Sequence, residues 1–157
     1  PIYLDFRAHH WPPPGLKLPE TLDPSILTAV LVATSVPMWL AVRHAKRGQS
    51  RQTVSMIALA AFVQAGYLAF QLHQLLAELH TVDPQQSAYA SAYIALLGLH
   101  HAHVLLGVLL DLGLLFWLAR SRLTAYRATG VRALALYWHV VNALAVAVLL
   151  TTLSPAL

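Results

Sequence analysis

The sequence has no cysteine and few charged residues. Charged side chains make up 10% of its 157 residues, compared with about 25% in typical soluble domains, while 58% of the residues are hydrophobic. Without cysteine, the chain can form neither a disulfide framework nor a thiolate metal site. The shortage of charge predicts an integral membrane protein.

The positive charges are concentrated in two short stretches between long apolar segments. Eight of the ten basic residues lie there: Arg43, Lys46, Arg47 and Arg51 in the first stretch, and Arg120, Arg122, Arg127 and Arg132 in the second. Basic loops are typical of the cytoplasmic side of a membrane, so loops 43–52 and 120–130 are expected there. A nucleic-acid interface would need a basic face on a soluble domain, and we therefore expect no nucleic-acid partner.

Four apolar segments are long enough to cross a bilayer, which takes about 20 helical residues. They cover about residues 25–43, 53–79, 87–119 and 129–153. The short connections predict an all-α integral membrane protein, an antiparallel bundle of four transmembrane helices within residues 25–157. Pro37 is expected to kink the first helix, which neighbouring helices can compensate in a membrane.

The first 24 residues have a different composition. Five prolines between Trp11 and Ser25 exclude a helix interior, so residues 1–24 are expected to form an extended, extracytoplasmic segment across the outer helix ends. Residues 2–7 could also be the end of an earlier helix. The chain starts with Pro1 and has no basic region with a cleavage site before its first apolar run, so we expect a processed or truncated start.

Two clusters of polar residues interrupt the last two apolar segments. The first contains His100, His101 and His103, and the second is the YWHVVN sequence at 137–142. Polar side chains at membrane depth are costly, so they usually face protein, headgroups or a cavity. His100 and His103 are three residues apart and should share a helix face, with His101 pointing elsewhere.

Histidines on facing helices could hold a haem or a metal. Counted from the cytoplasmic helix ends, however, His103 and His139 differ in depth by about 9 Å, whereas a haem with two histidine ligands needs them opposite each other. Multi-ligand spacings such as Glu-x-x-His are also absent. We therefore expect the imidazoles to hydrogen-bond between helices, to Asn142, glutamines, carbonyls or lipid headgroups. A redox or metal role and proton handling are the alternatives.

Asp111 is the one carboxylate well inside an apolar segment. It could relay protons, contact a partner subunit, or reach from the inner interface to an arginine of the next loop, which is the preferred interpretation. Gln71 and Gln74 are expected to tie helices together. Small residues that allow close packing are expected on helix interfaces: Gly98, Ala102, Gly107, Ala133, Ala135, Ala143 and Ala145.

Three motifs follow one another along the chain. The first is WPPPG at 11–15; in the second, Tyr89–Ser91 precedes Gly98, His100, His103, Val104 and Gly107; the third combines Tyr137, Trp138, His139 and Val141. Together they resemble subunit III of the haem–copper respiratory oxidases, in which W-P-P-x-G precedes the fourth of seven helices. A later helix of that family carries Tyr-Gly-Ser and then Gly-Phe-His-Gly-x-His-Val with a following Gly, and the last carries Tyr-Trp-His-Phe-Val-Asp. The resemblance is to the C-terminal part of such a subunit.

The chain also departs from the family pattern. The substituted positions are Ala90, His101 and Asn142 within the motifs, and Gln74, Arg132 and Ala145 outside them. In place of Ala90 and His101 the family has glycine, and in place of Asn142 it has aspartate. It has glutamate in place of Arg132 and near Gln74, and tryptophan in place of Ala145. The missing acids weaken any role in proton handling.

The resemblance implies a non-catalytic subunit of a haem–copper terminal oxidase, which supports the catalytic subunit in aerobic respiratory electron transport and binds structural phospholipid. It implies no catalytic, cofactor or metal site in this chain: haem and copper belong to the partner subunit I, and subunit II is a further partner. The implied location is the bacterial cytoplasmic membrane, with Arg127 and Arg132 as candidates for the phospholipid headgroup. The residues expected to make structural, lipid or interhelical contacts are His100, His103, Trp138, His139, Asn142, Arg127, Arg132, Gln74 and Asp111.

Other functions are compatible with the same residues. An accessory subunit of a quinol oxidase or nitric oxide reductase would carry the same features, because a partner recognises the electron donor. A b-type haem electron carrier would use His100, His103 and His139. Short loops and the lack of inverted repeats argue against a transporter.

Overall fold

The computed structural model describes residues 22–79, 88–120 and 124–153, and every regular element found there is a helix. The first membrane-length rod consists of two helices, α2 (Leu22–Ala33) and α3 (Ser35–Lys46). The other three rods are single helices: α4 (Ser50–Leu79), α5 (Ala88–Ala119) and α6 (Ala125–Leu153).

These rods have the properties of membrane spans. The stretches that are long and apolar enough to cross a bilayer are Pro24–Lys46, Ser50–Leu76, Ile94–Ala119 and Tyr126–Leu150. The predicted all-α, multi-pass membrane fold is therefore confirmed. The predictions for residues 1–21, which include the WPPPG motif, and for the loop at 80–87 lie outside the described residues.

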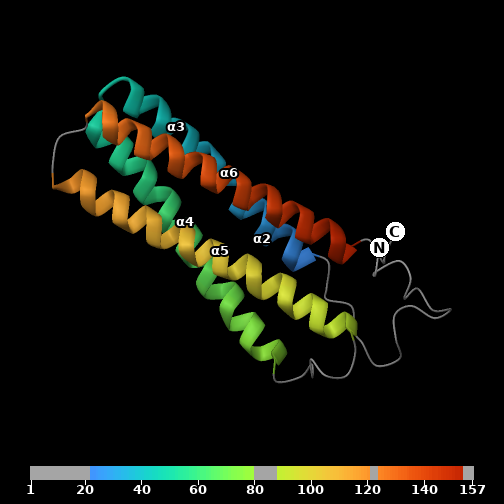
Figure 1. Cartoon of the computed structure of the whole chain (residues 1–157). Helices are drawn as coiled ribbons and strands as arrows, with labels where there is room; N and C mark the ends of the chain where they lie inside the picture. Colours follow the sequence, from blue (N-terminus) through green and yellow to red (C-terminus); the bar gives the residue numbers. More distant parts are fainter. Residues whose placement is uncertain (1–21, 80–87, 121–123, 154–157) are drawn as a thin grey trace.

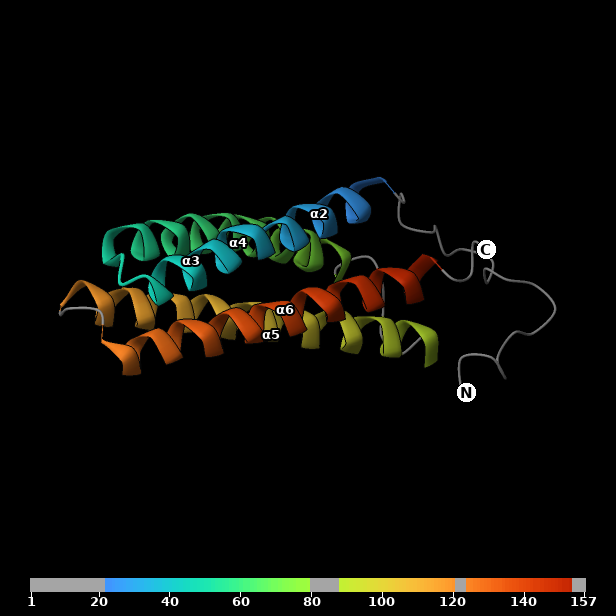
Figure 2. The same ribbon diagram turned by 90° about the horizontal axis from the view of Figure 1, so that it is seen from above.

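The rods run antiparallel along a common axis (Figure 1) and form two layers (Figure 2). One layer contains α2, α3 and α4, and the other contains α5 and α6. Helix α3 packs against α4 and α6, α5 also packs against α4 and α6, and α2 contacts both α4 and α6. Each rod therefore lies between two neighbours, as in other antiparallel four-helix bundles.

The helices are apolar on their outer as well as their inner faces. Phe62 on α4 is 80% exposed and Leu136 on α6 is 65% exposed, as expected for side chains that contact lipid. The buried core includes Leu31, Ile57 and Val104. Since lipid is as apolar as a buried leucine, close packing and interhelical hydrogen bonds must hold the bundle together.

The first rod is interrupted at Thr34, between α2 and α3. Pro37 has no N–H group to donate to the carbonyl of Ala33, four residues earlier. The Thr34 hydroxyl donates to the Leu31 carbonyl at 2.6 Å, and the Thr34 N–H donates to the same carbonyl at 3.1 Å. The kink expected from Pro37 is thus a local change of helix geometry that begins at Thr34.

A tight turn joins α3 to α4. Gly48 has a φ of 70°, a conformation that glycine adopts without steric cost. Its N–H donates to the Ala45 carbonyl at 3.1 Å, and the Gln49 N–H donates to the His44 carbonyl at 3.0 Å. These two bonds form a Schellman motif that ends α3.

Both basic stretches lie at one end of the bundle. The turn from α3 to α4, the C-terminal end of α5 and the N-terminal end of α6 lie at the same end in Figure 1, on its left side. We call this end, which carries the described basic residues of stretches 43–51 and 120–132, the basic end.

Candidate functional site

Trp138 is fully buried where α6 packs against α5. Its indole Nε1–H lies 3.1 and 3.0 Å from the two carboxylate oxygens of Asp111, which is itself fully buried. Gly107 lies one helical turn before Asp111, and a Cβ added there would come within 2.6 Å of the Trp138 ring. The missing side chain of Gly107 leaves space for the indole, and Asp111 orients it. Gly107, Asp111 and Trp138 form what we call the Trp138 junction.

The position of Asp111 differs from the preferred interpretation of the sequence. Its carboxylate accepts a hydrogen bond from α6 inside the bundle, and no ion pair to an arginine is found in the described part of the chain. The interaction was missed because Trp138 was not considered as a donor for a buried acid, although indole N–H groups usually find an acceptor when buried.

His100 connects α5 to α4. Its Nε2 lies 3.3 Å from the hydroxyl of Tyr67, and the two rings meet edge to face with centroids 6.4 Å apart. The same hydroxyl accepts a hydrogen bond from Gln71 Nε2 at 3.3 Å. The interhelical bond that the sequence predicts for His100 is therefore present, and Gln71 supports it from within α4.

The burial of the α5 histidines does not follow the face that His100 and His103 were expected to share. His100 and His101 are the buried pair, 6% and 5% exposed, whereas His103 is only half-buried. His101 and His103 each bond through Nδ1 to a carbonyl one turn earlier on α5, at 2.6 and 2.7 Å. These two imidazoles thus bond within their own helix and not, in the described residues, to another helix.

His139 lies on the exposed side of α6 and has no hydrogen bond to any residue that the structure describes. Its neighbour Tyr137 donates to the backbone carbonyl of His103 at 2.8 Å instead. The expected interhelical bond of His139 is therefore not found. The described residues also contain no group of three or more His, Cys, Asp or Glu side chains that could hold a metal.

Two buried amides bind the break in the first rod from opposite sides. Gln64 on α4 donates to the Thr34 hydroxyl at 3.1 Å, and Asn142 on α6 donates to the Ser35 hydroxyl at 2.8 Å. Both amide side chains are buried, with exposed fractions of 0% and 4%. The break is thus fastened to both neighbouring helices, and Asn142 makes an interhelical contact as expected.

Gln64 was missed by the sequence reasoning, which considered Gln71 and Gln74. Gln64, Tyr67 and Gln71 follow one another at spacings of three and four residues and therefore share a face of α4, which was a usable signal. Gln74 is half-buried, and no hydrogen bond of its side chain is found within the described ranges.

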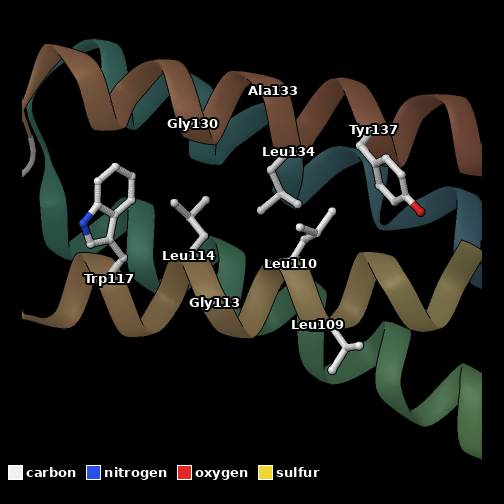
Figure 3. A pocket seen from close by; sticks show the side chains of 9 residues that line it. All are labelled: Leu109, Leu110, Gly113, Leu114, Trp117, Gly130, Ala133, Leu134 and Tyr137. Atoms are coloured by element: carbon white, nitrogen blue, oxygen red, sulfur yellow. The ribbon is translucent and has the colours of Figure 1, made fainter.

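An apolar groove of about 670 Å³ lies between α5 and α6 (Figure 3). Trp117 and Tyr137 lie at its two ends, and leucines of both helices line it together with Gly113 and Gly130. A Cβ added at Gly113 would meet no atom within 4 Å. Volumes of this size are typical of small-molecule sites, so the groove could hold part of an apolar ligand.

Arginines stack on aromatic rings at the basic end. The Arg127 guanidinium lies 4.8 Å above the centre of Trp117, at the end of the groove, and Trp117 also meets Tyr126 edge to face. Arg120 stacks on Phe116 in the same way, at 4.0 Å. Cation–π stacking holds these charges beside apolar surface. Arg132 on α6 is exposed.

The small residues divide into two groups. Gly107, Ala135 and Ala145 are buried as expected, whereas Ala102, Ala133 and Ala143 are exposed. A Cβ added at Gly98 would meet no atom within 4 Å. Close packing between α5 and α6 therefore depends on Gly107 and not on every small side chain of these helices.

Comparison with known proteins identifies relatives of the whole bundle. Residues 6–153 match the family model described as cytochrome c oxidase subunit III. Cytochrome c oxidase subunit 3 of Corynebacterium diphtheriae is 30% identical over 146 residues, covering 92% of this chain and 67% of that protein. Cytochrome bo(3) ubiquinol oxidase subunit 3 of Pseudomonas aeruginosa is 30% identical over 126 residues, which cover 78% of this chain and 58% of that protein. Quinol oxidase subunit 3 of Bacillus spizizenii is 27% identical over 115 residues, which cover 73% of this chain and 56% of that protein.

The chain spans between 56% and 67% of the length of these three relatives. In the structure, the two motifs in the last two helices meet, since Gly107 of one accommodates Trp138 of the other and Tyr137 bonds to the backbone of His103. Because the family match extends over nearly all of the chain and its motif residues contact one another, the chain belongs to the cytochrome c oxidase subunit III family.

Proposed function

We propose that this chain is a non-catalytic subunit of a haem–copper terminal oxidase. It would pack beside a catalytic subunit I, which carries the haem and copper, and would work together with subunit II. The main support is that the motif residues Trp138, His100 and Tyr137 bond to neighbouring helices. Such contacts suit a scaffold that stabilises a neighbour, because they rigidify the bundle without presenting a reactive group.

The electron donor of the complex is a separate question. The relatives include subunits named for cytochrome c oxidase, for ubiquinol oxidase and for quinol oxidase. Subunits of this family therefore serve with different donors, and we propose that the partner selects the donor. A role in a quinol oxidase is the second candidate function, favoured by the names of those two relatives.

Co-purification tests this function. We expect a tagged chain, extracted from its native membrane in mild detergent, to retain a polypeptide that contains haem and copper. The absorption spectrum of the complex should show haem bands that disappear when the chain is separated from that polypeptide. Haem that stays with the separated chain would contradict the proposal and would favour a b-type electron carrier.

We further propose that the groove between α5 and α6 holds an acyl chain of a structural phospholipid. The groove is lined by apolar side chains and opens between two lipid-facing helices. Arg127 stacks on Trp117 at the end of the groove, where a guanidinium can bind a phosphate through paired hydrogen bonds. Arg132 is exposed on the same helix and is the second candidate for the headgroup.

Measuring the retained phospholipid tests whether Arg127 and Arg132 bind its headgroup. Replacing Arg127 and Arg132 together by alanine should reduce the anionic phospholipid that is retained in mild detergent, because the headgroup loses its cations. Arg51→Ala is the matched control, since Arg51 is also exposed at the basic end but lies on α4. Equal retention by the double variant and the control would contradict the headgroup assignment.

The proposed location is the bacterial cytoplasmic membrane, with the basic end in the cytoplasm. The named relatives are bacterial proteins, and both basic stretches lie at that end. Basic loops are retained on the cytoplasmic side during membrane insertion.

A further inference from the structure

His100 and His101 each have one buried ring nitrogen without a hydrogen-bond partner in the described part of the chain. These atoms are His100 Nδ1 and His101 Nε2, and both side chains are more than nine-tenths buried. An unpaired polar atom at this depth is costly, and buried polar atoms in folded proteins are nearly always paired. The two atoms therefore call for a ligand, and its chemistry follows from which of them carries a proton.

The hydrogen bonds around His100 favour one of its two tautomers. The Tyr67 hydroxyl accepts a hydrogen bond from Gln71 Nε2, which leaves its own O–H free to donate to His100 Nε2, 3.3 Å away. Since a neutral imidazole has one donor and one acceptor nitrogen, an accepting Nε2 places the proton on Nδ1. The unpaired Nδ1 of His100 is thus a hydrogen-bond donor.

The backbone determines the tautomer of His101. Its Nδ1 lies 2.6 Å from the carbonyl oxygen of Leu97, which can only accept, so Nδ1 carries the proton. A second proton would place a positive charge inside a membrane span, at a large cost. The unpaired Nε2 of His101 is therefore an acceptor, complementary to the donor on His100.

We propose that one buried water molecule bridges His100 and His101. It would accept from Nδ1–H of His100 and donate to Nε2 of His101. The ring centroids are 5.9 Å apart and the rings are inclined at 73°. At this separation one water oxygen between the rings can reach a nitrogen of each with hydrogen bonds of about 2.9 Å, and buried waters typically serve unpaired polar groups of this kind.

The water completes a chain of hydrogen bonds with a single direction. Gln71 donates to Tyr67, Tyr67 to His100, His100 to the water, the water to His101, and His101 to the Leu97 carbonyl. A metal ion fits less well, because it needs a lone pair from each nitrogen and His100 Nδ1 carries a proton. The site depends on His101, a position at which the resemblance to subunit III implies glycine.

Solid-state NMR on the ¹⁵N-labelled full chain in lipid bilayers, with any co-purifying subunits, tests this site. The imidazole shifts should identify His100 and His101 as neutral Nδ1–H tautomers, and magnetisation from water should reach the Nδ1–H of His100. An Nε2–H tautomer at His100, or no transfer from water in the unmodified chain, would overturn the proposal. So would a stoichiometric metal that stays with this chain after it has been separated from any co-purifying subunits.

Variants separate the bridging water from general hydration. His101→Phe should abolish the transfer from water to the Nδ1–H of His100, because the water loses its acceptor. His103→Phe is the control and should leave it unchanged, since the hydrogen bond of the His103 side chain lies within its own helix. Tyr67→Phe should abolish the preference of His100 for the Nδ1–H tautomer. Unchanged transfer in His101→Phe would contradict the proposal, and the measurements on the unmodified chain decide it if that variant does not fold.

Discussion

Gly107 and Trp138 are complementary in shape. The indole ring occupies the space that a side chain at position 107 would fill, and its N–H is directed at a carboxylate one turn further along α5. Between lipid-facing helices there is no hydrophobic driving force. The stability of the contact between α5 and α6 therefore depends strongly on this close fit and on the hydrogen bond.

Gly107→Ala is expected to destabilise the bundle by about 1–3 kcal/mol, the usual cost of overpacking a filled core. The added methyl group would lie within 2.6 Å of a fully buried ring, closer than packed carbon atoms approach one another. Unfolding in mixed micelles measures the effect. Gly98→Ala on the same helix is the control, since its Cβ meets no atom within 4 Å. If both variants change stability equally, the packing at Gly107 is not as described.

A double-mutant cycle measures the hydrogen bond between Asp111 and Trp138. The variants are Asp111→Leu, Trp138→Phe and the combination of the two. We expect a coupling free energy of about 1 kcal/mol, within the range for interhelical hydrogen bonds in membranes. The double variant should lose less stability than the sum of the two single variants, because each single variant leaves one buried polar partner unpaired. Additive effects would show that the bond contributes nothing to stability.

The residues of the site were predictable in type but not in orientation. His100, Asn142 and Trp138 were identified because polar or amphipathic side chains inside spans are unusual. Which histidines face inwards was not, because leucine and valine occur on every side of α5 and give no periodic signal. Depth counted from helix ends places Asp111 and Trp138 within about 1.5 Å of each other, in keeping with their hydrogen bond, but the count was applied only to the histidines.

At the level of elements, the break between α2 and α3 is stabilised by its neighbours. Pro37 and the threonine hydroxyl alter the helix locally, and Gln64 and Asn142 bind the two hydroxyls at the break. Proline is tolerated in membrane helices when such partners satisfy the freed groups. The sequence predicted a kink from Pro37, but the two amides that fasten it come from residues 30 and 107 positions away, which single-sequence periodicity does not connect.

The groove between α5 and α6 is expected to lose its lipid when it is filled. Gly113→Leu places a side chain in the groove without a clash at its Cβ, so the fold should survive while the space for an acyl chain shrinks. Native mass spectrometry should detect less co-purified phospholipid. Gly66→Leu on α4 is the matched control, because that glycine is also exposed and unobstructed. Unchanged lipid content in Gly113→Leu would contradict the acyl-chain assignment.

For the whole molecule, the absence of cysteine allows a direct test of orientation. In spheroplasts, a cysteine introduced as Arg51→Cys at the basic end should react with a membrane-impermeant maleimide only after lysis. Asp83→Cys, between α4 and α5 in the sequence, should react before lysis. The reverse pattern would contradict the cytoplasmic position of the basic end, which rests on the distribution of arginine and lysine.

The fold of the whole molecule was the most predictable level. Hydropathy and length identify the spans, because a bilayer imposes a minimum number of apolar residues, and short connections impose antiparallel neighbours. The arrangement of the helices in two layers was not predictable in the same way. It depends on a few contacts, such as those of Trp138 and Gln64, in helices whose outer and inner faces have similar hydrophobicity.

The fit of Trp138 against Gly107 also restricts how such sequences can diverge. A larger residue at position 107 can be accommodated only if the residue at position 138 is smaller. A smaller residue at position 138 would leave a cavity unless a larger residue at position 107 filled it. The two positions are therefore expected to covary among homologues.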